Sequence, residues 1–310
     1  MNSKDPAEMH HKVVIIQGPT CAGKTQVALA LAGRFAGEII NADSMQFYRF
    51  MDIGTSKPDP SQMQQVPHHL FSIVPPDRRF TAADFMTLGR NVITEIVRRK
   101  SLPLVVGGTG LYLKALTQGV FEAPHPDEEL RRKLHAMPSD ERHKALRDLD
   151  PEAAERIAVN DTVRVVRALE ICYNTGKPIS WHHRKHRFED RPFQCCKICI
   201  IRERQSLYSR IEKRVDTMME NGFVEEVRGL LDRGFAPELP TMRSIGYKEI
   251  TAFLQGRLSQ EEAAARIKTN TKRYAKRQLT WFRKDTDCRR VTLPDEAERV
   301  YGIVEKFLKT

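Results

Sequence analysis

Short apolar runs alternate with amphipathic stretches along the first third of the chain. Three of these runs have the length of a buried strand, at residues 13–16, 38–42 and 104–106. Residues 26–35 and the stretch from Thr81 to about Lys100 have helical periodicity, with Thr81 as the expected N-cap. Alternating strands and helices favour a parallel sheet covered by helices on both faces, so we predict an α/β fold.

This alternation stops between residues 121 and 193, where charged, helix-prone pieces replace the β-branched runs. We therefore predict a helical insertion domain at 121–193. Apolar runs return at 197–201 and 290–293, which predicts two further strands. The core is then discontinuous, formed by residues 12–120 and 194–310.

The first apolar run leads into the pattern G-x-x-x-x-G-K-[ST]. Its residues are Gly18, Pro19, Thr20, Cys21, Ala22, Gly23, Lys24 and Thr25. Between a strand and a helix, this pattern lets backbone N–H groups and a helix N-terminus surround phosphate oxygens. Lys24 supplies a mobile positive charge and the Thr25 hydroxyl a ligand for Mg²⁺. We predict a P-loop NTPase-like core that binds a di- or triphosphate.

Asp43 follows the second predicted strand, at the same carboxyl edge of the sheet as the P-loop. The strand at 104–106, where a Walker B acid is expected, ends in glycines instead. That absence disfavours an NTPase that activates water and suits a group transfer in which phosphate is not the electrophile. Asp43 becomes the candidate general base, with a turn or N-cap role as its alternative.

The net charge of +11 and the pI near 9.4 indicate a polyanionic partner, most simply nucleic acid. Residues 266–284 contain eight basic residues and no acid. We expect Lys268, Lys272 and Lys276 to face phosphates, with a solvated basic face as the alternative. The opposite face is expected to pack through Ile267, Tyr274 and Trp281.

Other features exclude whole classes of protein. The chain has no long apolar run and starts with polar residues, so we expect neither a membrane span nor a signal peptide. Six cysteines beside a P-loop suggest a reducing, cytoplasmic location.

Cys196-x-x-Cys199 has the spacing of zinc ligands, but Cys199 alternates within an apolar run, and His182 and His186 lie among cations. This setting disfavours zinc.

Six segments, taken together, closely resemble bacterial tRNA dimethylallyltransferases. They are GPTCAGKT, NADSMQFYRFMDIGTSKP, VGGTGLYLKAL, NDTVRVVRALE, MRSIGYKE and KRQLTWFRK, in order between residues 13 and 284. Members of that family transfer a dimethylallyl group from dimethylallyl diphosphate to N6 of the adenosine 3′-adjacent to the anticodon. The resemblance implies a Mg²⁺-dependent prenyltransferase whose partner is the tRNA anticodon stem-loop. We expect it to act as a monomer.

The resemblance also implies roles for single residues. The P-loop would bind the diphosphate with Mg²⁺ at Thr25, and Asp43 would accept a proton from the adenine amine. Thr20 and Arg243 would complete the catalytic set, with Arg243 approaching the diphosphate. The positions that match tRNA contacts are Asp43, Ser44, Met45, Gln46, Thr109, Arg131, Val163, Arg164, Val165, Val166, Arg167, Arg243, Ser244, Ile245, Gly246, Tyr247 and Lys248. Cys21-Ala22 departs from the commoner Ala-Ser, and Lys248 from a frequent Arg, but neither change removes a required group.

Two other functions are compatible with these residues. A P-loop kinase acting on a nucleotide or a small alcohol could also carry an arginine-bearing insertion. A noncatalytic, nucleotide-gated RNA-binding protein would bind RNA without changing its covalent structure.

Overall fold

The computed structural model describes residues 11–121, 124, 127–186 and 190–310. Its contacts divide the chain into two compact units. Unit 1 comprises Met1–Thr117 and Arg191–Thr310, and unit 2 is Gln118–Asp190. Unit 2 begins and ends slightly earlier than the insertion expected at 121–193. In the part of the chain that the structure describes, no helix is both long and apolar enough to cross a bilayer.

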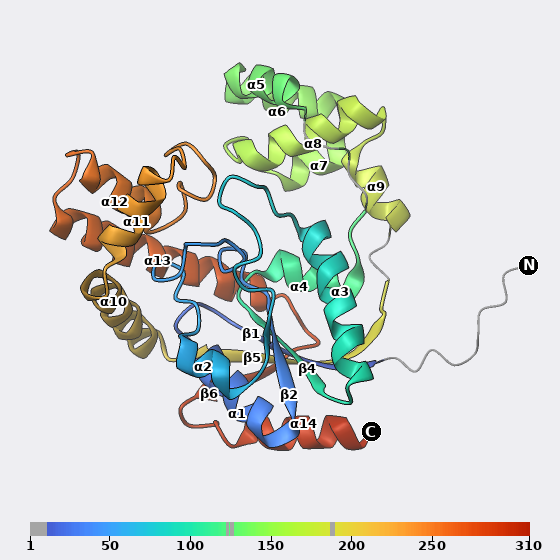
Figure 1. Cartoon of the computed structure of the whole chain (residues 1–310). Coiled ribbons are helices and arrows are strands. Elements are labelled where there is room, and N and C mark those ends of the chain that lie inside the picture. The colour runs from blue at the N-terminus through green and yellow to red at the C-terminus, as the bar shows by residue number, and fades with distance from the viewer. Residues whose placement is uncertain (1–10, 122–123, 125–126, 187–189) are drawn as a thin grey trace, which may run out of the picture. The chain divides into compact units, whose positions relative to one another are not determined.

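Unit 1 is built on one parallel, six-stranded sheet with the order β3-β2-β4-β1-β5-β6 (Figure 1). The strands are β1 His11–Gln17, β2 Gly37–Asn41, β3 His68–His69, β4 Leu102–Gly107, β5 Phe193–Arg202 and β6 Arg289–Leu293. In the central register, Val14 lies opposite Leu104 on one side and Cys196 on the other. The parallel sheet predicted from the alternating pattern is confirmed.

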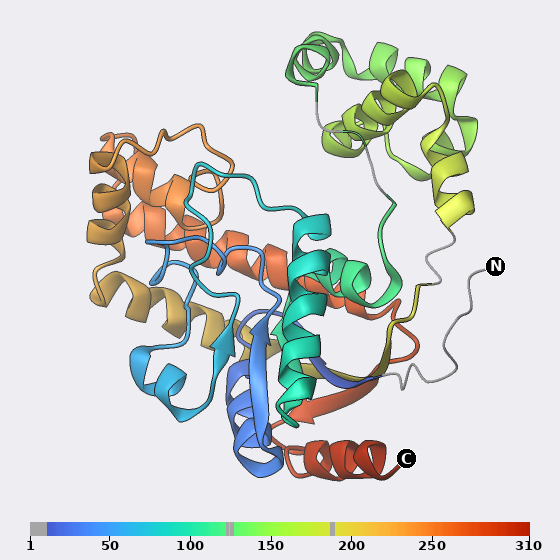
Figure 2. The ribbon, with the colours of Figure 1, turned by 45° about the vertical axis from the view of Figure 1, so that its right-hand side comes forward.

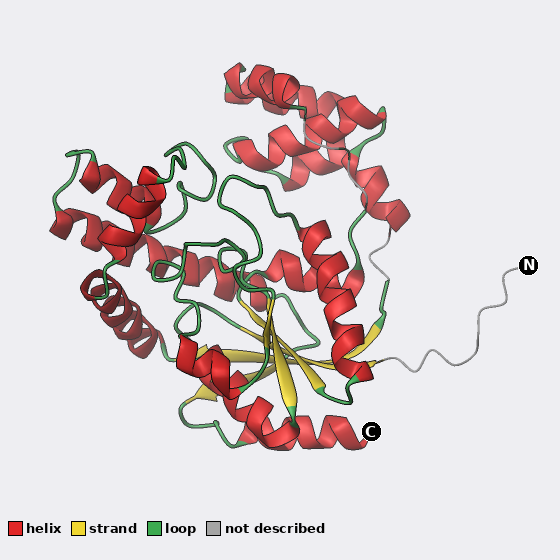
Figure 3. Ribbon diagram, viewed as in Figure 1, coloured by secondary structure: helices red, strands yellow, loops and turns green. Residues whose placement is uncertain are grey.

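Two helical layers cover this sheet, one on each face (Figure 3). The helices of unit 1 are α1 Lys24–Phe35, α2 Pro60–Gln65, α3 Ala82–Arg98, α4 Gly110–Gln118, α10 Arg204–Glu220, α11 Phe223–Asp232, α12 Tyr247–Leu254, α13 Gln260–Phe282 and α14 Arg299–Lys309. Thr81 caps α3 as expected, and its capping box with Asp84 is complete.

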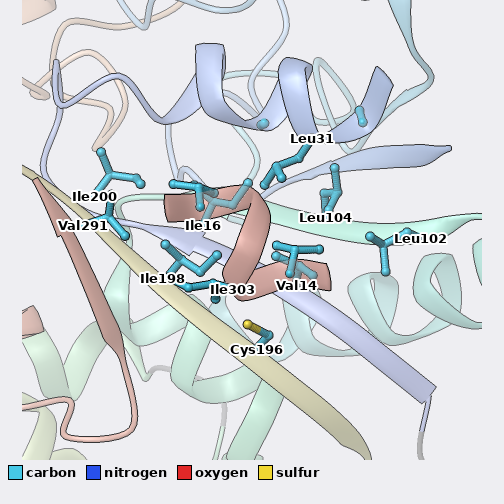
Figure 4. Packing of buried hydrophobic residues seen from close by; sticks show 14 of the residues in the cluster. Val14, Ile16, Leu31, Leu102, Leu104, Cys196, Ile198, Ile200, Val291 and Ile303 are labelled. Atoms are coloured by element: carbon cyan, nitrogen blue, oxygen red, sulfur yellow. The ribbon is translucent and has the colours of Figure 1, made fainter. Parts of the chain in front are cut away.

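Successive side chains of β1 point to opposite faces of the sheet, and apolar residues cover both faces. Val14 and Ile16 pack with α1 and α14, as Figure 4 shows for one face. Val13 and Ile15 point the other way, into the cluster that α3 and α4 close. Because both faces are buried, the strands read as continuous apolar runs and not as alternating ones.

A third apolar cluster lies among α10, α11, α12 and α13. It gathers Val215, Phe223, Ile250 and Ile267 with Met51 from the loop after β2. These helices lie together on one side of the sheet in two views (Figures 1 and 2). They bring side chains from the last third of the chain toward the P-loop.

Unit 2 is helical, as the lack of β-branched runs predicted. Its helices are α5 Glu128–Ala136, α6 Ser139–Leu149, α7 Pro151–Arg156, α8 Thr162–Thr175 and α9 Ile179–His186. A separate core forms around Leu134, Leu146, Val165 and Leu169. Asp127 caps α5, which carries Arg131, and Asp161 caps α8, which carries Arg164 and Arg167.

Candidate functional site

A cavity of about 700 Å³ opens in unit 1 at the carboxyl ends of β1, β2 and β4. Ligands of open α/β sheets bind at this edge. The P-loop contributes Thr20, Lys24 and Thr25, and the end of β2 contributes Asp43. The helical layer contributes Arg214 from α10. Phosphate-binding and titratable groups therefore share one space.

Two glycines make the path of the P-loop possible. Gly18 has a φ of 143°, and a Cβ there would lie 2.3 Å from the Ile200 carbonyl oxygen. Gly23 has a φ of 106° where α1 begins. Side chains at either position would force the loop away from the sheet, so both glycines are needed for the cradle.

The P-loop is tied to the second glycine-rich turn by a residue that the sequence did not single out. The Gln278 side chain accepts a hydrogen bond from the Thr20 backbone N–H at 2.9 Å. Its Nε2 donates to the Gly108 carbonyl oxygen at 2.9 Å. Gln278 is 5% exposed. α13 therefore fixes the relative positions of the two loops at the cavity.

Lys24 lies partly buried in the cavity wall, where its Nζ donates to the Pro19 carbonyl oxygen at 2.8 Å. The pKa of Lys24 is lowered to about 8, chiefly because burial disfavours the charged form; the Asp43 carboxylate opposes this shift and the nearby Arg214 adds to it. Asp43 and Lys24 line the same cavity. A bound diphosphate would stabilise the charged form of Lys24.

Asp43 makes the turn contact that the sequence left open as an alternative, and it also lines the cavity. Its Oδ1 accepts the Met45 backbone N–H at 3.0 Å, which is a turn contact. Its own N–H donates to the Asn41 side chain at 2.8 Å. The carboxylate also lines the cavity, so one oxygen shapes the turn while the other is available for chemistry.

Thr109 holds the turn after Asp43 in place from the neighbouring strand end. Its Oγ1 accepts the Ser44 backbone N–H at 3.0 Å. Ser44, Met45 and Gln46 line the cavity, and Gln46 also donates to the Thr55 carbonyl oxygen at 3.0 Å. These residues form one continuous wall beside the carboxylate.

Arg202 and Arg210 donate to backbone carbonyl oxygens of the P-loop. Arg214 of α10 contacts the same loop from inside the cavity, and no sequence motif marks it. Its Nη1 donates to the Thr20 hydroxyl at 2.8 Å, and its Nε donates to the Ser56 hydroxyl at 2.5 Å. Arg243, which the resemblance placed near the diphosphate, lines the same cavity. Arg214 is one of several cations in a helical stretch without a motif, so no local signal distinguishes it.

Residues 243–247 line the cavity, and α12 begins at Tyr247. Tyr247 is only 1% exposed, and its hydroxyl donates to Glu226 at 2.7 Å. Glu226 also accepts the backbone N–H groups of Asp52, Ile53 and Gly54. The Tyr247 side chain therefore supports the wall from within, whereas Arg243 and Lys248 are exposed.

Helix α13 contains the acid-free basic run, but its cations are not equivalent. Lys268 pairs with Asp216 at 2.6 Å and Lys272 with Glu212 at 2.5 Å, both on α10. These two lysines face acids of a helix remote in sequence, and the expectation that they contact phosphates stays a prediction. Trp281 is 43% exposed although its indole lies against Gly110, so it is much less buried than Ile267.

Unit 2 carries its own group of arginines. Arg131 and Arg167 both pair with the buried carboxylate of Glu170, at 2.9 and 3.4 Å. Arg164 is exposed and Val163 is 77% exposed at the start of α8. Two further positions of this segment, Val165 and Val166, instead have their side chains in the core of the unit.

The histidines and cysteines that suggested zinc have other neighbours. Cys196 and Cys199 are free, buried thiols on β5. The His182 Nε2 lies 2.9 Å from the Thr175 hydroxyl, and its ring stacks on Phe121. Across residues 11–121, 124, 127–186 and 190–310, no three histidine, cysteine or acidic residues are grouped to hold a metal ion.

Fold and site together define a P-loop protein that binds a phosphorylated substrate beside a carboxylate. A family model described as IPP transferase matches residues 46–285, and one described as isopentenyl transferase matches residues 11–72. The tRNA dimethylallyltransferase of Geobacter sulfurreducens is 50% identical over 300 residues, which cover 96% of each chain. That of Geobacter metallireducens is 49% identical over 300 residues, covering 96% of this chain and 97% of the relative.

The chain is also similar to solved structures of proteins of this kind. A tRNA isopentenylpyrophosphate transferase from Bacillus halodurans has a TM-score of 0.73 and 39% identity, covering 96% of this chain and 97% of that one. A eukaryotic dimethylallyltransferase described as acting on tRNA has a TM-score of 0.83 and 30% identity, covering 96% and 80%. The chain belongs to the IPP transferase family, which confirms the resemblance seen in the sequence.

Proposed function

We propose that the protein transfers a dimethylallyl group from dimethylallyl diphosphate to tRNA. The acceptor is N6 of the adenosine 3′-adjacent to the anticodon, and the products are N6-isopentenyladenosine and diphosphate. The observation that carries this proposal is that Asp43 and the P-loop Lys24 line one cavity. Family membership supports it independently, through relatives named tRNA dimethylallyltransferase.

The leaving group is stabilised by positive charge. An allylic diphosphate ionises once the charge on its departing oxygens is neutralised, so donors placed there lower the barrier. Lys24, the P-loop residues and Arg214 surround this part of the cavity. Arg243 lines the cavity wall as a further cation.

Asp43 serves as the general base. The adenine amine is a poor nucleophile, so a carboxylate within hydrogen-bonding reach must accept its proton as the C–N bond forms. The base has to leave the stack of the anticodon loop to reach this position. Ser44, Met45 and Gln46 line the cavity beside the carboxylate and would contact the flipped nucleotide.

Mg²⁺ is part of the proposal. The Thr25 hydroxyl lines the cavity in the first turn of α1 and offers a hard oxygen ligand, which suits Mg²⁺ together with diphosphate oxygens. When bound there, the ion would neutralise charge on the diphosphate. Thr25 would hold it while Lys24 binds the same group from the cavity wall.

The tRNA anticodon stem-loop is the expected macromolecular partner. In unit 2, Arg131, Val163, Arg164 and Arg167 would contact the RNA, and the arginines would bind its phosphates. Thr109 would act by fixing the turn at Ser44. We further propose that one chain binds one tRNA as a monomer in the cytoplasm, which size-exclusion chromatography of the complex checks for stoichiometry.

The test is incubation of unmodified tRNA with dimethylallyl diphosphate and Mg²⁺, followed by nucleoside mass spectrometry. We expect N6-isopentenyladenosine at the position next to the anticodon. ATP consumption with phosphorylation of a small acceptor and no prenylated RNA would favour the kinase instead. RNA binding without any change in RNA mass would favour a noncatalytic protein.

A further inference from the structure

A second cavity, of about 450 Å³, adjoins the main one within unit 1. It lies between α12, the first half of α13 and the loop around Pro237. Arg243 lines both cavities, so the two spaces meet at this side chain. A ligand that extended from the main cavity past Arg243 would reach the second one.

The second cavity carries an excess of positive charge. Its cations are Arg243, Lys248, Arg257 and Arg266, and its acids are Glu238 and Glu249. Glu249 is buried and already accepts hydrogen bonds from the Gly246 N–H at 2.7 Å and from Asn270 at 2.8 Å. Glu249 caps α12 and lies 3.6 Å from Lys248, which leaves three arginines against the one remaining acid, Glu238.

The arginines of this cavity are not held by acids. Neither Arg243 nor Arg266 forms an ion pair with a residue that the structure describes. Arg257 donates to the neutral side chain of Gln255. This contrasts with Lys268 and Lys272 on the same helix as Arg266, which acids of α10 engage. The N–H groups of these guanidinium side chains are therefore available to bind a ligand.

One further group in the wall has unused hydrogen-bonding capacity. Thr251 is 3% exposed and lines the cavity, and its hydroxyl has no hydrogen-bond partner within the described residues. A buried hydroxyl without a partner is unfavourable, so such a group commonly marks a position that a ligand or water satisfies. Cations and a spare hydroxyl together suit an oxyanion.

We propose that this second cavity binds a backbone phosphate of the RNA substrate, next to the nucleotide held in the main cavity. The proposal rests on the proposed function, in which that nucleotide belongs to tRNA. Guanidinium groups bind phosphate with two parallel hydrogen bonds, and phosphate contacts fix the register of a nucleic acid. Arg257 and Arg266 are then positioning residues that hold the RNA strand after it passes Arg243.

The experiment compares three double variants with the wild-type chain. Arg257→Ala with Arg266→Ala removes the pair, and Arg257→Lys with Arg266→Lys keeps its charge. Lys306→Ala with Lys309→Ala is the matched control, because it removes the same charge from α14, which lines neither of these two cavities. tRNA binding is measured by fluorescence anisotropy over a range of salt concentrations, without dimethylallyl diphosphate.

We expect the alanine pair to weaken tRNA binding about tenfold or more at low salt. The slope of log affinity against log salt concentration should become shallower by about one for each lost phosphate contact. The lysine pair should restore the salt dependence and part of the affinity. The α14 control should match the wild type. Thermal unfolding should be unchanged in all variants, because the substituted side chains are exposed.

Wild-type affinity and salt dependence in the alanine pair would overturn the proposal. So would saturable binding of inorganic phosphate that the alanine pair abolishes while tRNA binding stays intact, since the site would then serve a free phosphate. Prenyl transfer is scored separately by nucleoside mass spectrometry of the wild-type reaction. If the wild type modifies tRNA and the alanine pair binds it normally, this inference fails and the proposed function stands.

Discussion

The Nη1 of Arg214 lies 2.8 Å from the Oγ1 of Thr20, so the middle of α10 contacts the tip of the P-loop across 194 positions of sequence. The same guanidinium donates to the Ser56 hydroxyl. One side chain therefore connects the P-loop with the loop that follows β2. Its position also adds a fixed positive charge at the place where a diphosphate would lie.

The first prediction concerns this arginine. We expect Arg214→Ala to lower kcat about 10²–10³-fold, because a donor aimed at the developing charge of the leaving group is lost. Lys213→Ala, at the exposed neighbouring position, is the control and should leave kcat unchanged. Steady-state kinetics at saturating tRNA measures the effect. Equal kcat values for the two variants would show that Arg214 does not act on the reaction.

The second prediction tests the base. Asp43→Asn retains an oxygen for the turn contact with the Met45 N–H but cannot accept a proton, so we expect kcat to fall about 10²–10⁴-fold. tRNA affinity should remain within a factor of about three, because the turn is preserved. Turnover is followed by nucleoside mass spectrometry and affinity by anisotropy. Wild-type turnover in this variant would rule out the assignment.

The third prediction follows from the pKa of Lys24, which burial lowers to about 8. Above that pH the free enzyme loses the ammonium charge, so its affinity for dimethylallyl diphosphate should fall as the pH rises through 8. Calorimetric titration between about pH 7 and 9.5 measures this, since the unperturbed lysine titrates near 10.4. Lys24→Ala should bind weakly with a flat profile. A wild-type affinity that is constant across this range would contradict the lowered pKa.

The same pKa has a consequence for stability. Between pH 8 and the usual range of lysine, the unfolded chain binds more protons at residue 24 than the folded chain does. The contribution of Lys24 to the free energy of unfolding should therefore rise with pH in this interval. Thermal unfolding of the wild type and Lys24→Ala, compared pH by pH, isolates that contribution.

The fourth prediction separates the cations of α13. Lys276 and Arg277 are exposed, and Arg277 lines the main cavity. Replacing both by alanine should make the slope of log tRNA affinity against log salt concentration shallower by about two. The pair Lys268→Ala with Lys272→Ala should change it far less, because acids of α10 already engage these lysines. Equal slopes for the two double variants would show that the ion pairs do not distinguish these cations.

The fifth prediction concerns the core of unit 2. Glu170 is fully buried and pairs with Arg131 and Arg167. Glu170→Ala should destabilise the protein by about 2–3 kcal/mol, less than for a wholly buried pair because both arginines are partly exposed. Chemical denaturation measures this, and Glu170→Gln should cost less because it still accepts a hydrogen bond. If the free energy of unfolding falls by less than about 0.5 kcal/mol, these ion pairs contribute no more to stability than exposed ones do.

Sequence patterns were enough to predict the features whose residues lie close together along the chain. The P-loop, its flanking strand and helix, and the capping box at Thr81 depend on residues within a few positions of one another. The parallel sheet followed from strands that are apolar on both faces. The family resemblance depended on the same kind of short segments and was confirmed by the comparisons.

Tertiary structure decided the features whose partners are distant in sequence. β3 consists of His68 and His69, which form a strand only because β2 offers them an edge. Arg214 reaches Thr20 because α10 packs beside the cavity, and Lys268 is paired because α10 presents Asp216 to it. The amino-acid order alone determined the P-loop and the apolar strands at the centre of the sheet, since those signals are local. Which cations face a ligand and which face an acid depends on the packing of helices far apart in the chain, and only the folded molecule settles it.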